Sequence, residues 1–220
     1  YYKIIDAIAE DERFTSQNMR PTVSLKLSSY TTEPLDRGGK GLGSTEAVSK
    51  IAAYAREKSV GLTIDMENRQ WTEHTLQFLD ELHLQGHQHV GAVIQTRLHR
   101  SRKDLEGLPK GCRVRLVIGI YNEPEEAAIV DKQAMKERLL EYAAVLLERG
   151  HYVEFASHDE LYIQRFLDEV VRARGFEKEN FEIQMLYGVP RKALQHSLIQ
   201  MGVKTRLYVP FAVAWGTAIA

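Results

Sequence analysis

The sequence contains one cysteine, Cys112, among 220 residues. A single cysteine excludes an intramolecular disulfide and a thiolate metal cluster, and it is typical of proteins from reducing compartments. Lysine and arginine total 29 and the acidic residues total 30, so the chain has no overall field that would attract nucleic acid. No apolar run reaches the roughly 20 residues of a membrane-crossing helix, and the first residues lack a secretory signal pattern. We therefore expect a soluble, cytoplasmic protein without nucleic-acid partners.

Short apolar runs alternate with longer stretches in which apolar residues recur every three or four positions. The runs predict seven strands, each apolar enough to be buried on both faces, at residues 22–30, 60–66, 90–98, 114–121, 152–157, 181–187 and 205–210. The intervening stretches predict helices, several closed by a glycine, at residues 44–58, 71–86, 102–108, 132–150, 158–175 and 191–202.

Strands and helices alternate along the whole chain, so each connection can cross over between parallel neighbours. An open doubly wound sheet and a closed barrel both satisfy this pattern, but the near-regular repeat favours the barrel. We predict an α/β fold, a (βα)8 TIM-like barrel, with residues 1–220 forming a single catalytic domain. Residues 1–10 look like an amphipathic helix, so we expect a first strand before them and a last helix after the final apolar stretch.

Polar residues stand at the carboxyl ends of the predicted strands, where barrel enzymes carry their reactive groups. A strand buried on both faces has little reason to carry charge, because desolvating a charged side chain is costly unless a partner compensates. We therefore expect a polar ligand at this rim. The residues concerned are Lys26, Asp65, Gln95, Arg115, Ser157, His158, Gln184, Tyr187 and Tyr208.

Most of these residues allow both a chemical and a structural interpretation. Lys26 suits a substrate carboxylate, a Schiff base as in aldolases, or an ion pair with Asp65. Arg115 and Gln95 suit a planar heterocycle with carbonyl oxygens and ring nitrogens, whereas Arg115 also suits a carboxylate that closes the barrel. His158 suits a phosphate at a helix N-terminus, although its neighbours suit a plain helix cap equally well.

Seven segments resemble proline dehydrogenase in order and spacing, including the domain found in bifunctional proline-utilisation flavoproteins. They are VSLKLSS, TIDME, VIQTRL, VRLVIGIY, FASHD, FEIQMLYG and RLYVP, and they cover nearly the whole chain. The resemblance implies a distorted (βα)8 barrel with non-covalent FAD that oxidises L-proline to Δ1-pyrroline-5-carboxylate. It also implies a quinone acceptor and a cytoplasmic location peripheral to the inner membrane, or the mitochondrial matrix in a eukaryote.

The resemblance also implies roles for individual residues, and none for a metal. The catalytic residues it implies are Lys26, Asp65, Arg115 and Tyr208. The residues it implies for the proline pocket are Lys26, Leu116, Tyr121 and Tyr208. Those it implies for FAD are Gln95, Arg115, Val117, Gly119, Ile120, Ser157, His158, Gln184, Leu186 and Tyr187.

Two other functions stay open at this point. One is a lyase or aldolase that forms a Schiff base at Lys26. The other is a degenerate barrel that binds an amino acid without catalysis, because the family usually carries lysine where Ile118 stands and alanine where Ile120 stands. The resemblance further implies a pair of arginines that clamp the proline carboxylate, in a last helix that the sequence does not reach.

Overall fold

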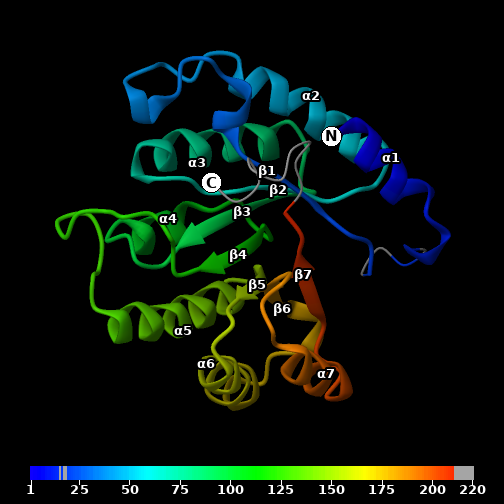
Figure 1. The fold of residues 1–220 in the computed structure, drawn as a ribbon, viewed down its shortest axis with the longest axis vertical. Coiled ribbons are helices and arrows are strands. Elements are labelled where there is room, and N and C mark those ends of the chain that lie inside the picture. Colours follow the sequence, from blue (N-terminus) through cyan, green and yellow to red (C-terminus); the bar gives the residue numbers. More distant parts are fainter. Residues whose placement is uncertain (15, 17–18, 211–220) are drawn as a thin grey trace.

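The computed structural model describes residues 1–14, 16 and 19–210 (Figure 1). Within this part of the chain, seven strands form one parallel sheet in chain order. All seven predicted strands are therefore confirmed, most of them shorter than expected. They are β1 (Val23–Leu25), β2 (Leu62–Ile64), β3 (Val90–Gln95), β4 (Arg113–Val117), β5 (Tyr152–Ala156), β6 (Phe181–Leu186) and β7 (Thr205–Tyr208).

Helices connect successive strands and cover the outer side of the sheet (Figure 1). Helix α3 packs against β3, α5 against β4 and β5, and α7 against β7. No helix in the described residues is long and apolar enough to cross a membrane. The α-helices are α1 (Tyr2–Glu10), α2 (Ser44–Glu57), α3 (Arg69–Leu84), α4 (Ser101–Gly107), α5 (Lys132–Glu148), α6 (Glu160–Arg165) and α7 (Lys192–Gln200). The shorter or irregular helices are η1 (Glu12–Phe14), η2 (Leu27–Tyr30), η3 (Leu35–Arg37), the π-helix η4 (Phe166–Arg172) and η5 (Lys178–Asn180).

The sheet curls until its last strand faces its first strands across a polar interior. Arg206 on β7 donates a hydrogen bond to the carbonyl oxygen of Arg20, which precedes β1, at 3.0 Å. The Tyr208 hydroxyl, also on β7, donates to Asp65 at the end of β2 at 2.9 Å. These contacts join residues that are 186 and 143 positions apart, as expected for a curled barrel rather than an open sheet.

Apolar side chains fill the space between the strands and the surrounding helices. The rings of Phe155 on β5 and Phe166 on η4 stack with centroids 4.2 Å apart, and Phe181 on β6 meets Phe166 edge-on. Side chains alternate along a strand, so the residues between these outward-facing ones point into the barrel. The hydrophobic core thus lies outside the sheet and leaves the interior to polar groups.

All seven strands end earlier than the sequence predicts, and the difference is largest for β1 and β4. Strand β1 stops at Leu25, because the Glu67 carboxylate binds both the backbone N–H of Ser28 and its hydroxyl, and these groups then belong to η2. Strand β4 stops at Val117, two residues before Gly119, whose φ of +106° is incompatible with an extended strand. In both places the chain leaves the sheet at the rim where polar residues gather.

Strand β7 contradicts the expectation that every strand is buried on both faces. Its residue Leu207 is 38% exposed, and the other three residues are only partly buried. Among the described residues β7 pairs with β6 alone, so it lies at an edge of the sheet. The apolar run at 205–210 has the composition of a central strand, and composition does not reveal how many neighbours a strand has.

Candidate active site

Asp65 and Arg115 form the centre of the carboxyl rim. Arg115 lies on β4 and donates from Nη1 to Asp65, which directly follows β2, at 2.6 Å. Both side chains are largely buried, with exposed fractions of 12% for Asp65 and 8% for Arg115. Burial raises the pKa of Asp65 above its ordinary value, while the charge of Arg115 and the hydrogen bond from Tyr208 oppose that rise. The pair confirms the interpretation of Arg115 as the partner of a carboxylate inside the barrel.

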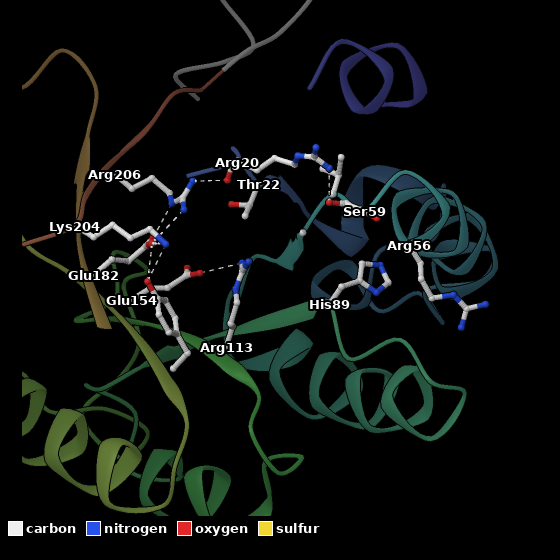
Figure 2. Close-up of a pocket in the computed structure, with 13 residues that line it drawn as sticks. Arg20, Thr22, Arg56, Ser59, His89, Arg113, Glu154, Glu182, Lys204 and Arg206 are labelled. Carbon is white, nitrogen blue, oxygen red and sulfur yellow. Dashed lines mark hydrogen bonds and ion pairs between the residues drawn. The ribbon is translucent and has the colours of Figure 1, made fainter. Parts of the chain in front are cut away.

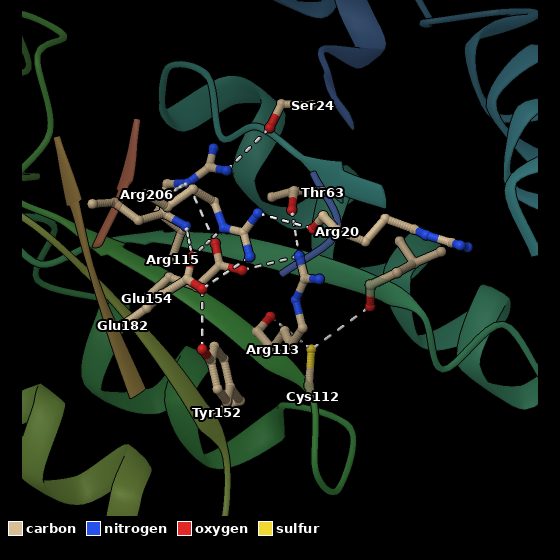
Figure 3. Close-up of polar contacts among 12 residues, drawn as sticks. Arg20, Ser24, Thr63, Cys112, Arg113, Arg115, Tyr152, Glu154, Glu182 and Arg206 are labelled. Carbon is tan, nitrogen blue, oxygen red and sulfur yellow. Dashed lines mark hydrogen bonds and ion pairs between the residues drawn. The ribbon is translucent and has the colours of Figure 1, made fainter. Parts of the chain in front are cut away.

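The other nitrogens of the Arg115 guanidinium connect β4 with three further strands, and Figure 3 shows the contacts with Ser24 and Glu154. Nε donates to the Gln184 side chain on β6 at 2.6 Å, and Nη2 donates to Ser24 on β1 at 3.1 Å. The carboxylate of Glu154 on β5 lies 3.5 Å from Nε. Three of the five N–H groups of an arginine are used in these hydrogen bonds, so two are left for a further acceptor.

Tyr208 closes one side of this centre. Its hydroxyl donates to Asp65, and its ring lies 5.1 Å from the Arg115 guanidinium carbon, in cation–π geometry. Burial and the adjacent Asp65 charge raise the pKa of the Tyr208 hydroxyl, so it stays protonated and able to donate. Tyr208 therefore fixes the orientation of both members of the pair.

Lys26 directly follows β1 and is exposed at the same rim. Its charge is close enough to Asp65 to lower the pKa of that carboxyl. Within the described residues, its ammonium has no hydrogen bond or ion pair. Glu67 fixes the chain beside it, because its carboxylate accepts the Ser28 backbone N–H at 3.0 Å and the Ser28 hydroxyl. Lys26 is thus an unpaired cation on an anchored backbone, and the predicted alternative of an ion pair with Asp65 does not occur.

Gln95 is the last residue of β3, and only the nitrogen of its side-chain amide has a hydrogen-bond partner in the described structure. Its Nε2 donates to the carbonyl oxygen of Glu67 at 2.6 Å, while its buried Oε1 has no hydrogen-bond partner in the described structure. Gly119 packs against this amide, and a Cβ at that position would lie 2.6 Å from Oε1. The arrangement leaves a buried acceptor beside a backbone that has no room for a side chain.

Ser157 and His158 follow β5 and lie next to the end of β6. The Ser157 hydroxyl accepts the backbone N–H of Asp159, and Asp159 accepts the N–H of Tyr162, so the helix-capping interpretation is confirmed for this turn. His158 Nε2 accepts the backbone N–H of Leu186 at 3.1 Å, and its buried Nδ1 has no partner in the described part of the chain. Burial and then the nearby Arg191 charge lower the pKa of His158.

The remaining candidates lie in two places. Val117 ends β4 on the inward face and Tyr121 lies in the loop that follows, where burial and then the charges of Glu67 and Asp65 raise the pKa of Tyr121 to about 12. Leu116 has no exposed surface and belongs to the core outside the sheet, because it alternates with the inward-facing Arg115. The structure therefore does not bring Leu116 together with the other candidates.

Three apolar candidates are exposed at or just beyond the strand ends. Ile120 is 91% exposed in the loop after β4, and Leu186 and Tyr187 are exposed at the end of β6. They are positioned to border a bound molecule at this rim without closing it. No group of three or more histidine, cysteine or acidic side chains in the described ranges is arranged to hold a metal ion.

A second layer of charged residues lies below this rim and was not predicted from the sequence. Glu154 and Glu182 are each about 1% exposed and hold cations of neighbouring strands. Glu182 accepts hydrogen bonds from Arg206 at 2.7 Å and from Gln184 at 2.6 Å. The alternation of side chains along a strand could have indicated these residues. Glu182 precedes Gln184 by two positions and so lies on the same face of β6, and Glu154 stands in an otherwise apolar run.

Comparison with known proteins identifies the family. The family described as "Proline dehydrogenase" matches residues 1–214. The chain is 36% identical over 215 residues to the proline dehydrogenase of Deinococcus radiodurans, covering 96% of this chain and 67% of that protein. It is 33% identical over 171 residues to proline dehydrogenase 2 of Bacillus subtilis, covering 77% of this chain and 55% of that protein.

Solved structures share the fold. One is the crystal structure of proline utilization A from Bdellovibrio bacteriovorus, a protein inactivated by N-propargylglycine. It matches this chain with a TM-score of 0.79 at 22% identity. That match covers 96% of this chain and 26% of the larger protein. A proline utilization A variant from Bradyrhizobium japonicum gives a TM-score of 0.80, over 94% of this chain and 24% of that protein. The predicted (βα)8 TIM-like fold is thereby confirmed, and the chain belongs to the proline dehydrogenase family.

Proposed function

We propose that the protein containing this chain oxidises L-proline to Δ1-pyrroline-5-carboxylate with FAD as cofactor. The observation that carries the proposal is the hydrogen-bonded cluster of Asp65, Arg115, Gln184 and Tyr208 at the carboxyl rim, with the unpaired Lys26 beside it. Family membership supports the reaction type. The chain spans about 55% to 67% of the curated relatives reported above, so the activity is proposed for the whole protein.

The residues of the rim fit a flavin. Within the described residues, Gln95 offers a buried acceptor without a partner, and Arg115 has two N–H donors that make no hydrogen bond, as a ring with both N–H and carbonyl groups requires. Gly119 lets the backbone lie directly against the Gln95 amide, because a Cβ there would be 2.6 Å from Oε1. We assign the isoalloxazine ring to Gln95, Arg115, Val117, Gly119 and Gln184, and the rest of FAD to Ile120, Ser157, His158, Leu186 and Tyr187.

Bound FAD would supply the acceptor for the hydride that leaves the proline carbon next to the ring nitrogen. The residues of this chain bind and orient the substrate. The Lys26 ammonium pairs with the proline carboxylate, because it is the one cation of the cluster without a carboxylate partner in the described structure. The Tyr208 ring lies over the Arg115 guanidinium and limits the access of water to it.

Asp65 acts through its neighbours in this proposal. Its carboxylate holds the Arg115 guanidinium at 2.6 Å and the Tyr208 hydroxyl at 2.9 Å, so it sets the position of both groups before the substrate binds. The Arg115 guanidinium in turn offsets negative charge that develops nearby during the reaction. We further propose that Tyr121 borders the proline ring, and we propose no pocket role for the buried Leu116.

Family membership also supports an electron acceptor, a membrane contact and a cellular location for this protein. We propose a quinone as electron acceptor and contact with the surface of a membrane. This corresponds to a cytoplasmic protein peripheral to the inner membrane, or to the mitochondrial matrix in a eukaryote. We also propose that residues 1–220 belong to one catalytic barrel domain.

The test uses the purified full-length protein. We expect flavin absorption bands in the protein as isolated or after addition of FAD, and we expect anaerobic L-proline to bleach them. Oxidation of proline should then be measured with an electron-accepting dye. Absence of flavin bands before and after FAD addition would contradict the proposal.

A trapping experiment separates this function from Schiff-base chemistry. Borohydride reduction in the presence of carbonyl compounds attaches the substrate to Lys26 only if the protein forms an imine there. We expect no adduct by peptide mass spectrometry, with Lys26→Arg as the control. A mass increase at Lys26 in the wild type would favour a lyase or aldolase instead.

A further inference from the structure

A cavity of about 510 Å³ opens at the amino ends of the strands, at the opposite end of the barrel from the candidate active site (Figure 2). Gly61 in its wall directly precedes β2, and Arg113 and Tyr152 are the first residues of β4 and β5. At about 3.3 Å per residue, the four steps from Arg113 to Val117 separate the two ends of the interior by roughly 13 Å. The cavity is therefore distinct from the rim assigned to proline and FAD.

The wall of this cavity has a surplus of positive charge. It contains five cationic side chains and two carboxylates, although the whole chain has a net charge of only −1. Such a concentration of one sign attracts anions, because the low-dielectric wall strengthens the field inside a pocket. The cations are Arg20, Arg56, Arg113, Lys204 and Arg206, and the carboxylates are Glu154 and Glu182.

Both carboxylates are already engaged by other cations of the wall. Glu154 pairs with Arg113 at 2.9 Å. Glu182 pairs with Arg206 at 2.7 Å and with Lys204 at 3.0 Å. The carboxylates thus balance part of the charge on the strand side and leave the opposite wall without an acidic partner.

Arg20 and Arg56 form that opposite wall (Figure 2). Arg20 donates to the carbonyl oxygens of Lys58 and Ser59, at 3.3 Å and 3.1 Å, and has no carboxylate partner among the described residues. Arg56 on α2 has neither a hydrogen bond nor an ion pair in the same part of the chain. Arg113 adds a buried Nε with no hydrogen-bond partner. Among the described residues, Arg56 and the Nε of Arg113 therefore lack an acceptor, and Arg20 adds a positive charge whose hydrogen bonds go only to carbonyl oxygens.

We propose that this cavity binds a phosphate-group anion, either inorganic phosphate or a small phosphomonoester. Guanidinium groups match phosphate oxygens in fork geometry, and the hydroxyls of Thr22 and Ser59 in the wall add uncharged donors. A dianion offsets most of the surplus of three positive charges. The volume lies within the range of about 300–1,000 Å³ that is usual for small-molecule sites, so it admits a phosphomonoester as well as phosphate.

The binding test uses isothermal titration calorimetry on the full-length protein at constant ionic strength. The probes are inorganic phosphate and AMP, and we expect saturable binding of at least one of them. Tighter binding of AMP identifies a phosphomonoester site, and equal or tighter binding of phosphate identifies an inorganic phosphate site. Arg56→Gln should weaken binding about tenfold, because a charge-assisted hydrogen bond is lost. Arg56→Glu should abolish it.

Arg138→Gln is the matched control, since it removes the same charge from a partly exposed position on α5, outside this cavity. We expect its affinity for the probes to equal that of the wild type. Equal weakening by Arg56→Gln and Arg138→Gln would overturn the proposal, because it would show non-specific attraction. The absence of saturable binding of both probes to the wild type would also overturn it.

A second measurement on the wild type does not depend on how a variant folds. Phenylglyoxal modifies accessible arginines, and the modified peptides are identified by mass spectrometry. We expect the bound probe to protect Arg20 and Arg56 and to leave Arg138 unprotected. Modification of Arg56 at the same rate with and without both probes would contradict the site.

Discussion

The two ends of the barrel interior carry similar polar residues in different states of pairing. At the amino end, Glu182 accepts hydrogen bonds from β5, β6 and β7, so the carboxylate is fully satisfied and joins these strands. At the carboxyl end, Lys26 has no described partner, and the buried Oε1 of Gln95 has none either. Within the described residues, the Glu182 carboxylate therefore stabilises the barrel, whereas Lys26 and Gln95 at the carboxyl end, like Arg56 and Arg113 in the amino-end cavity, keep groups available for a ligand.

One series of hydrogen bonds joins the two ends of the barrel interior. Arg115 donates to both Asp65 and Gln184. Gln184 donates to Glu182, and Glu182 also accepts a hydrogen bond from Arg206. Each link is 2.6 to 2.7 Å between the donor and acceptor atoms. A change near the middle of this series should therefore affect both stability and the active site, while a change of Lys26, which lies outside the series, should affect the site alone.

The largest effect is expected for Arg115→Met. This variant leaves Asp65 buried without its cation and removes the hydrogen bonds to Gln184 and Ser24. Removing one partner of a buried pair costs about 3–5 kcal/mol, so the free energy of unfolding should fall by that amount. Loss of the guanidinium should also slow flavin reduction by proline about 100-fold or more. Denaturant unfolding and stopped-flow absorbance measure the two effects.

Arg138→Met is the matched control for this variant, since Arg138 pairs with Glu141 on the half-exposed surface of α5. We expect its unfolding free energy to stay within about 0.5 kcal/mol of the wild type and its rate of flavin reduction to be unchanged. If Arg115→Met were as stable as this control, the description of Arg115 as the connection between the two ends would be wrong.

The next effect concerns Glu182 and pH. Burial alone would raise the pKa of Glu182, but the hydrogen bond and charge of Arg206, with Gln184 and Lys204, outweigh burial and lower the pKa to about 2. A carboxyl whose pKa is lowered by folding stabilises the folded state above its unfolded pKa of about 4.3 and loses this contribution as pH falls toward 2. The contribution at neutral pH is on the order of 3 kcal/mol.

Glu182→Gln should therefore be less stable than the wild type at pH 7, by a few kcal/mol, and the difference should shrink as pH falls from 5 to 2. Urea unfolding across this range measures it. Glu160→Gln, an exposed change in the first turn of α6, should keep the pH dependence of the wild type. A difference between Glu182→Gln and the wild type that stays constant with pH would show that the Glu182 charge does not stabilise the amino end.

A smaller effect is expected for Tyr208→Phe, which removes only the hydroxyl that donates to Asp65. The free energy of unfolding should fall by about 1.5 kcal/mol. Burial raises the pKa of Asp65 and the Tyr208 hydrogen bond opposes this, so the pKa should rise further in the variant. Because protonated Asp65 no longer holds Arg115 as an ion pair, the acid limb of the kcat/KM profile should move to higher pH. An unchanged acid limb would exclude Asp65 as the group that titrates there.

The sequence predicted the order of the strands and the rim because both follow from local patterns. The apolar runs mark β1 to β7, and a parallel crossover brings the carboxyl ends to one edge, so Lys26, Asp65 and Arg115 were expected together. The pairing of Arg115 stayed open because a guanidinium suits a carboxylate and a heterocycle equally well. The partners of Arg115 follow only from the curl of the sheet, which brings Ser24 and Gln184 next to its guanidinium.

The cavity at the amino end could not be predicted for a related reason. Arg20, Arg56 and Arg113 belong to a loop, a helix and a strand that are far apart in the sequence, and each looks like an ordinary surface or strand residue. The end of β1 was also missed, because it depends on Glu67, which is 39 positions from Ser28. Contacts that depend on the closure of the barrel leave no periodic pattern in the sequence.

The smallest effect on stability is expected for Lys26→Ala, which sharpens the contrast between the two ends. Lys26 is exposed and has no hydrogen bond or ion pair to the described residues, so the unfolding free energy should change by less than about 0.5 kcal/mol. Its ammonium is assigned to the substrate carboxylate, so the Kd of cyclopentanecarboxylate, a proline analogue without the ring nitrogen, should rise about tenfold. Lys50→Ala, an exposed lysine on α2 that pairs with Glu46, should leave this Kd unchanged. A variant that lost stability but kept its affinity would show that Lys26 serves the barrel, as Glu182 does, because only an interaction made in the folded protein without ligand produces that pattern.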